Sequence, residues 1–93
     1  MRFEWSARKA HTNVAKHGVS FHEAATVFAD PLALTFDDPH HSANELRYLT
    51  FGVSDRSRPL VVAHTPRGDN IRIISARGMT PRERSQYEQL NQG

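Results

Sequence analysis

The chain has 93 residues, of which 12 are basic and 10 acidic, and it has no cysteine. This length suffices for a single domain (residues 1–93), and the lack of cysteine excludes disulfides, thiolate metal sites and thiol redox chemistry. No apolar run approaches the ~20 residues of a membrane span, and the N-terminus lacks the apolar segment of a signal peptide, so we expect a cytoplasmic protein without a membrane partner. Arginine dominates the basic residues, which suits phosphate binding but also occurs in many small basic proteins.

The N-terminal third predicts a short strand over residues 2–5 and then two helices. Ser6 is a helix N-cap, the first helix runs to about Lys16, and Gly18 stands where a helix commonly ends. One side of this helix is thinly apolar, with Ala7, Ala10 and Val14, and another side gathers Arg8, Lys9, Asn13 and Lys16.

The second helix carries the strongest local signals in the sequence. Ser20 and Glu23 form a capping box, and Asp30-Pro31 ends the helix. Apolar residues recur at the helical spacing of one buried face: Phe21, Ala24, Ala25 and Phe28.

The rest of the chain predicts strands and a last helix. Residues 32–36, 45–54, 60–65 and 71–77 are apolar or alternating runs separated by turn residues, which indicates an antiparallel meander. Thr80 and Glu83 form another capping box, and the polar helix after it, to about Leu90, depends on Tyr87 for apolar contact. The predicted fold is α+β, in the order β-α-α-β-β-β-β-α, with the helices packed on an antiparallel sheet.

A series of short motifs along the chain resembles the BrnT family of small toxins. They lie between Phe3 and about Glu88, and they are Phe3-Glu4-Trp5, Lys9, Asn13, residues 16–21, Glu23-Ala24, Asp30-Pro31, Glu45-Leu46-Arg47, Gly52, residues 60–62, residues 71–77, Glu83-Arg84 and Tyr87-Glu88. Many relatives have Asp-Pro after the tryptophan, where this chain has Ser6-Ala7. Serine caps a helix about as well as aspartate, so this difference is conservative.

The resemblance implies a fold similar to that of the RelE ribonuclease toxins, and an endoribonuclease that inhibits translation and growth. It also implies a partner similar to BrnA, an antitoxin with a ribbon-helix-helix DNA-binding part. Toxin and antitoxin of such pairs form a 2:2 complex that represses its own operon, so operator DNA is contacted only through the antitoxin. No cofactor is implied.

Metal-free cleavage of RNA requires a base for the 2′-OH, an acid for the leaving 5′ oxygen and cations for the phosphoryl oxygens, and it yields a 2′,3′-cyclic phosphate. Arg77, at the end of the last strand, is the first candidate for the cation. Arg72 lies five residues earlier and therefore projects from the opposite face of a regular strand, where a structural or antitoxin contact is favoured. Arg47 is either a second phosphate ligand or the ion-pair partner of Glu45.

The acid and base candidates are His17, Glu45, His64 and Glu83. His17 ends a helix, where the dipole favours its protonated form, so it is either an acid or a simple helix-terminal charge. The strand spacing of His64 favours a core or edge histidine over a catalyst. Glu83 is assigned to its capping box, and Glu45 is either a base or half of an ion pair.

Further candidates come from the last helix and the basic residues. Tyr87 matches a tyrosine that RelE-like folds use near the end of the chain, and it either stacks on a base or anchors the helix in the core. Candidate RNA contacts are Lys9, Lys16, Arg72 and Arg84.

Three rival interpretations remain beside the nuclease, one of which is a degraded toxin that is kept only as the partner of the antitoxin. A zinc or nickel site over Asp37, Asp38, His40 and His41 is disfavoured because no spaced metal motif is present, so no metal is predicted. A non-catalytic basic module that binds nucleic acid or protein is the main alternative function.

Overall fold

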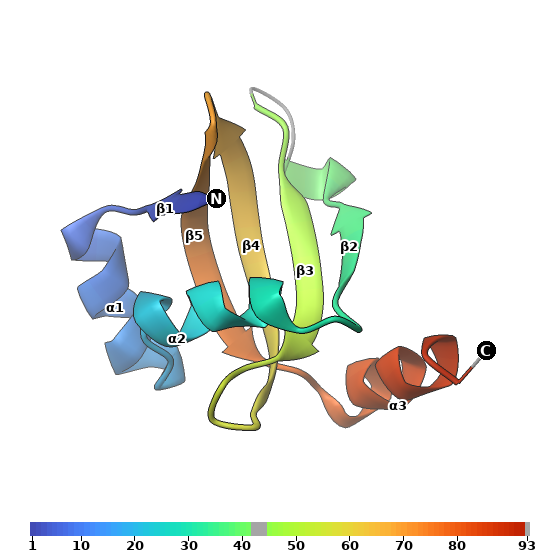
Figure 1. Ribbon diagram of the computed structural model, residues 1–93. Coiled ribbons are helices and arrows are strands. Elements are labelled where there is room, and N and C mark those ends of the chain that lie inside the picture. The colour runs from blue at the N-terminus through green and yellow to red at the C-terminus, as the bar shows by residue number, and fades with distance from the viewer. Residues whose placement is uncertain (42–44, 93) are drawn as a thin grey trace.

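The computed structural model describes residues 1–41 and 45–92, and it has a five-stranded sheet with the two N-terminal helices on one face (Figure 1). The strands are β1 (Arg2–Glu4), β2 (Leu34–Asp37), β3 (Tyr48–Val53), β4 (Pro59–Arg67) and β5 (Asn70–Gly78). They lie in the order β1-β5-β4-β3-β2. The helical elements are α1 (Ala7–His17), α2 (Phe21–Thr26), two 3-10 turns, η1 (Val27–Ala29) and η2 (Pro39–His41), and α3 (Pro81–Leu90).

The sheet is mixed, which corrects the prediction of a purely antiparallel one. Strands β2 to β5 form the predicted antiparallel meander. Strand β1 instead pairs in parallel with β5, with Arg2 opposite Asn70 and Glu4 opposite Arg72. A parallel neighbour requires a long connection, and here that connection is the rest of the chain.

The predicted ends of α1 are confirmed. The Ser6 hydroxyl accepts a hydrogen bond from the Lys9 N–H at 3.3 Å, and Gly18 closes the helix with φ +68°. The predicted apolar side of this helix is only partly confirmed: Ala10 packs against the core, but Val14 is 49% exposed and the buried residue is Asn13. Asn13 therefore does not belong to the exposed basic side either.

Helix α2 continues into η1 and packs its predicted apolar stripe against the sheet. The Ser20 cap is confirmed, with Oγ accepting from the Glu23 N–H at 3.1 Å. The carboxylate of Glu23 does not return to the cap; it accepts hydrogen bonds from Ser54 and Arg58, so half of the predicted capping box is wrong. The core between helices and sheet consists of Val19, Phe21, Ala24, Val27, Leu60, Val62, Ile73 and Ala76.

Helix α3 lies at the end of the sheet, away from α1 (Figure 1). Its predicted capping box is complete, since the Glu83 N–H donates to Thr80 Oγ1 at 3.1 Å and the Thr80 N–H donates to Glu83 Oε1 at 2.8 Å. Among the described residues, no helix is long and apolar enough to cross a membrane.

Candidate functional site

The two faces of the sheet have different surroundings. Leu60, Val62 and His64 of β4 alternate toward α1 and α2, whereas Val61, Ala63 and Thr65 alternate toward the other side. We call this second side the open face because α1 and α2 pack on the opposite side, although Val61 and Thr65 themselves are each only 2% exposed. The arginines predicted for phosphate binding can now be placed relative to it.

Arg72 and Arg77 lie on the same side of the sheet, which corrects the prediction that they project from opposite faces. Arg72 is opposite Thr65 and Arg77 is opposite Val61, four residues apart on β4 and therefore on one face. The register shifts between Ala63 and His64, so β5 contains one residue more than β4 over this stretch. A β-bulge of this kind reverses the alternation that a regular strand would have.

A row of polar side chains crosses one end of the open face. Glu4 of β1 is opposite Arg72 of β5, which is opposite Thr65 of β4. Arg47 directly precedes β3, and because Tyr48 is opposite His64, Arg47 falls level with Thr65. The backbones of Arg72 and Arg47 are thus two strand spacings apart, or about 10 Å. We call Glu4, Arg72, Thr65 and Arg47 the open-face row.

A glutamate accompanies each arginine of the row. Arg72 Nη1 lies 3.3 Å from Glu4 Oε2, and Arg47 Nε lies 3.3 Å from Glu45 Oε1. The side chains of both arginines are about 30% exposed, at 32% and 28%, so a ligand can reach them. The predicted Arg47–Glu45 ion pair is confirmed, and the row places a carboxylate beside each cation.

Arg77 lies at the other end of the open face and makes a forked ion pair with Glu83. Its Nη1 and Nη2 atoms donate to the two carboxylate oxygens at 2.7 and 3.0 Å. The guanidinium lowers the pKa of Glu83 to about 2, and Glu83 in turn raises the pKa of Arg77. A carboxylate with so low a pKa is a poor general base. The ion pair instead joins β5 to the start of α3, and Glu83 serves the helix cap, as predicted.

Tyr87 anchors α3 rather than offering its ring to a base. Only 9% of the residue is exposed, and its hydroxyl donates to Asp30 Oδ2 at 2.7 Å. Burial and the contact with Asp30 raise the pKa of Tyr87 to about 12. Burial also raises the pKa of Asp30, but the hydrogen bonds from Tyr87 and from the N–H groups of Val53 and Leu32 outweigh it and leave that pKa lowered. The core-anchor interpretation of Tyr87 is confirmed.

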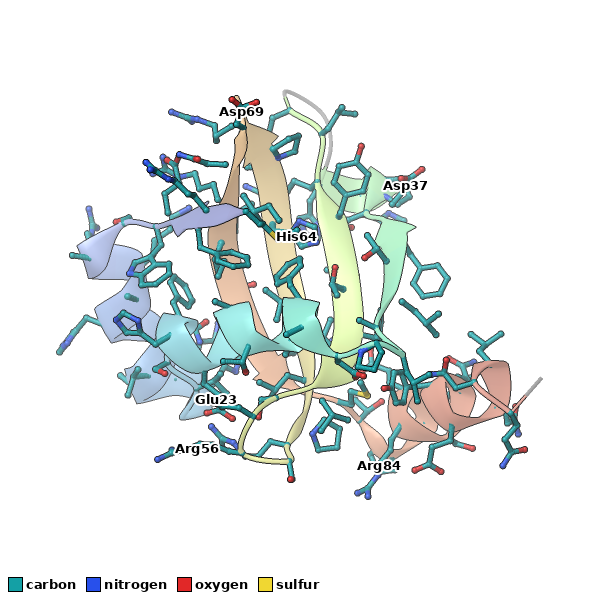
Figure 2. All side chains as sticks on the ribbon, in the orientation of Figure 1. Glu23, Asp37, Arg56, His64, Asp69 and Arg84 are labelled. Atoms are coloured by element: carbon teal, nitrogen blue, oxygen red, sulfur yellow. The ribbon has the colours of Figure 1, made fainter. Side chains whose placement is uncertain are left out.

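His64 is a core histidine on the helix side of the sheet (Figure 2). It is 7% exposed, lies against the ring of Phe28 and has Nε2 2.7 Å from Thr50 Oγ1. Burial lowers its pKa to about 4, so the ring is neutral at physiological pH. Because His64 faces away from the open face, it cannot reach a substrate bound on the row.

The other predicted residues lie away from the row. His17 ends α1 and borders two neighbouring hollows, one of which it shares with Lys9 and Lys16. Arg84 is on α3, where its Nε lies 3.4 Å from Glu88 Oε1 in an exposed pair. His41 contacts Asp38 at 3.1 Å, but the described residues contain no group of three side chains arranged to hold a metal ion.

A groove of about 610 Å³ separates α3 from the open face near β2 and β3. Phe36 and Leu90 are large apolar side chains on opposite sides of it, 46% and 61% exposed. The remaining lining residues are Leu34, Leu49, Phe51, Glu83, Gln86, Tyr87 and Gln89.

Comparison with known proteins identifies the family. The family described as ribonuclease toxin, BrnT, of type II toxin-antitoxin system, matches residues 5–83. The chain belongs to the BrnT family of ribonuclease toxins. The crystal structure of the ribonuclease toxin BrnT of Brucella abortus is similar, with a TM-score of 0.68 and 25% identity over 86% of this chain and 97% of that one. No curated protein sequence matches.

Family membership establishes that the toxin has a protein partner, and the structure adds Glu4 and Thr65 to the candidate site. A BrnT family toxin of a type II system has an antitoxin partner. Glu4 and Thr65 of the row were not among the sequence candidates, although Glu4 belongs to a motif of the resemblance. Only the pairing of β1 with β5 reveals that Glu4 faces Arg72.

Proposed function

We propose that this toxin is a metal-independent endoribonuclease that cleaves RNA on the open-face row. The observation that carries the proposal is the alignment of Arg72 and Arg47 on the open face, with their backbones level with each other and about 10 Å apart across β4. Arginine side chains are long, so two guanidinium groups carried by backbones about 10 Å apart can hold the non-bridging oxygens of one phosphate between them.

In this proposal the row divides the work of the reaction. Glu45, beside Arg47, takes the proton of the 2′-OH, and the 2′ oxygen then attacks the adjacent phosphorus. The bond from phosphorus to the 5′ oxygen breaks, the 5′ oxygen takes a proton from water, and a 2′,3′-cyclic phosphate and a 5′-OH result. Arg72 and Arg47 stabilise the charge that develops on the phosphoryl oxygens, which is commonly the largest contribution to such a reaction.

We further propose that the antitoxin silences the toxin by binding in the apolar groove beside α3. The family implies a protein partner, and an apolar groove with an uncharged wall of Gln86 and Gln89 suits the apolar face of an antitoxin segment. A BrnA-like ribbon-helix-helix antitoxin, a 2:2 complex that represses its operon, a RelE-like fold, translation inhibition and a cytoplasmic location belong to the same proposal, on the resemblance described above.

The test is cleavage of defined, protein-free RNA with EDTA present, by the wild type and by Arg72→Gln, Arg47→Gln, Arg77→Gln and the exposed control Arg82→Gln. We expect Arg72→Gln and Arg47→Gln to lower kcat/KM at least about 100-fold, as for other removed electrostatic donors. Arg82→Gln should cleave as the wild type does, and the product should carry a cyclic phosphate.

Other outcomes identify the alternatives. Loss of cleavage in Arg77→Gln with full activity in Arg72→Gln would move the site to the α3 end of the open face. If the wild type leaves every RNA intact and its expression does not arrest bacterial growth, the non-catalytic binding module becomes the better description.

A further inference from the structure

A second hollow lies between α1 and the exposed edge of β5, on the other side of the molecule from the α3 groove. It has a volume of about 530 Å³. Its charged lining residues are all basic, and its neutral polar lining residues are three hydroxyl residues and a buried amide. The lining residues are Ser6, Arg8, Lys9, Thr12, Asn13, Lys16, His17, Ile74 and Ser75. Among the described residues, no carboxylate lines this α1–β5 groove.

Arg8 and Lys9, the first two cations of α1, do not stabilise the helix. Helix α1 has no acidic residue in its first turn, where the positive end of the helix dipole favours carboxylates, and Arg8 and Lys9 stand near that end instead. Their position is unfavourable for the helix. Lys16 and His17, in contrast, stand at the end where the dipole favours positive charge.

The wall of the groove is rigid because Asn13 joins the helix to the strand. Its Nδ2 donates to the carbonyl oxygens of Ala76 at 2.8 Å and Val19 at 2.9 Å, and its Oδ1 accepts from the Ala76 N–H at 3.1 Å. The side chain thereby takes the place of a neighbouring strand at Ala76. The basic residues one turn on either side of it are thus held at a fixed distance from the strand edge.

The groove connects at both ends with other features of the molecule. At one end it begins near the open-face row, because Ser6 follows Glu4 by two residues and Ser75 lies on the same face as Arg72. At the other end His17 also lines a neighbouring hollow of about 330 Å³ that contains Arg58 and Arg84. Arg58 is paired with the buried Glu23 and Arg84 with Glu88, so each of these charges is partly neutralised.

We propose that the α1–β5 groove binds the sugar–phosphate backbone of a single RNA strand whose scissile phosphate lies on the open-face row. This inference rests on the proposed ribonuclease function. A helix of 11 residues is about 16 Å long, so the groove accommodates a few successive phosphates of one strand. Lys9 and Lys16 contact those phosphates, and the hydroxyl groups of Ser6 and Ser75 donate to phosphate or ribose oxygens. The charge of this groove carries no sequence information, so it supplies affinity and register rather than specificity.

The test measures binding without cleavage. A fluorescent, fully 2′-O-methylated oligoribonucleotide, which lacks the attacking hydroxyl, is titrated at several salt concentrations with the wild type, with the double variant Lys9→Gln/Lys16→Gln and with the control Arg56→Gln. Arg56 is exposed in the β3–β4 loop and lines neither the groove nor the neighbouring hollow (Figure 2). Thermal unfolding verifies that all three proteins are folded.

We expect the double variant to bind more weakly. The negative slope of log K against log[salt] should become shallower by about 1.4, since each lost phosphate contact on a single strand accounts for about 0.7 of its magnitude. Arg56→Gln should keep the wild-type slope. Equal slopes for the wild type and the double variant, or an equal loss in Arg56→Gln, would overturn the proposal. Because the oligonucleotide cannot be cleaved, a failure of the ribonuclease proposal would leave this result intact, and the two can fail separately.

Discussion

At the scale of single residues, Asn13 differs most between sequence and structure. Its neighbours Arg8, Lys9 and Lys16 are exposed as the helical spacing predicts, but Asn13 is 5% exposed and hydrogen-bonded to Ala76 of β5 and to Val19, which lies between α1 and α2. An asparagine among basic residues predicts a solvent-facing position, because nothing in the local sequence indicates that a strand edge lies beside it. The edge at Ala76 is 63 residues away along the chain.

Replacing Asn13 should therefore destabilise the fold more than an ordinary polar substitution on α1. In Asn13→Ala the N–H and C=O groups of Ala76 lose their partner, and each buried unsatisfied group costs about 1–3 kcal/mol. The measurement is the free energy of unfolding in urea. Thr12→Ala is the matched control, because the Thr12 hydroxyl bonds only to its own helix, and it should change stability by about 0.5 kcal/mol or less. Equal losses in the two variants would show that the Asn13 contacts contribute nothing.

At the scale of elements, the sequence predicted the helix caps and the antiparallel meander correctly, but it did not predict the parallel pairing of β1 or the bulge in β5. The caps at Ser6, Ser20 and Thr80 depend on residues three positions away, so the sequence contains them in full. The parallel pairing of β1 and the bulge in β5 depend on distant strands, and the bulge alone reverses the side on which Arg72 lies relative to Arg77. This is why the row, which combines three strands and the residue before a fourth, could not be predicted from the sequence.

Helix α3 provides the prediction at this scale, on the proposal that the antitoxin binds beside it. Burying Leu90 at an interface is expected to contribute about 1.5–3 kcal/mol, so Leu90→Gln should weaken binding of the co-expressed antitoxin by about tenfold or more. Val14→Gln is the matched control, an exposed apolar residue of α1 on another part of the surface. Amide exchange of residues 80–90 should slow in the complex. Unchanged affinity together with unchanged exchange would place the antitoxin elsewhere.

At the scale of the whole molecule, Glu23, Glu83 and His64 all have lowered pKa values, and each of them makes the folded state less stable as the pH falls. Glu23 accepts hydrogen bonds from Arg58 and Ser54 between α2 and the β3–β4 loop, and the bond from Arg58 is the main reason that its pKa is lowered to about 2 (Figure 2). Glu83 is held in the same way by Arg77 at α3, with its pKa also near 2. His64 lies apart from both of these pairs in the core, with its pKa lowered to about 4 by burial.

These shifts predict two successive losses of stability as the pH falls. For His64 the folded pKa is about 4 and the ordinary value 6.5, so between these values the unfolded chain binds a proton that the folded chain does not, and folding weakens as the pH falls through that range. For Glu23 and Glu83 the corresponding range extends from 4.5 to about 2, and their contribution is fully present only above it.

The contribution of His64 can be isolated by its slope against pH. The difference between a pKa of 6.5 and one of about 4 corresponds to about 3 kcal/mol, which should be lost progressively over that interval. We expect His64→Gln to have its own, pH-independent cost but to abolish most of the slope between pH 6.5 and 4.5, while the steep fall below 4.5 remains. The measurement is the urea unfolding free energy at a series of pH values, with the exposed His11→Gln as the control. If His64→Gln and His11→Gln kept the same slope as the wild type above pH 4.5, His64 would not be the residue whose protonation weakens the fold there.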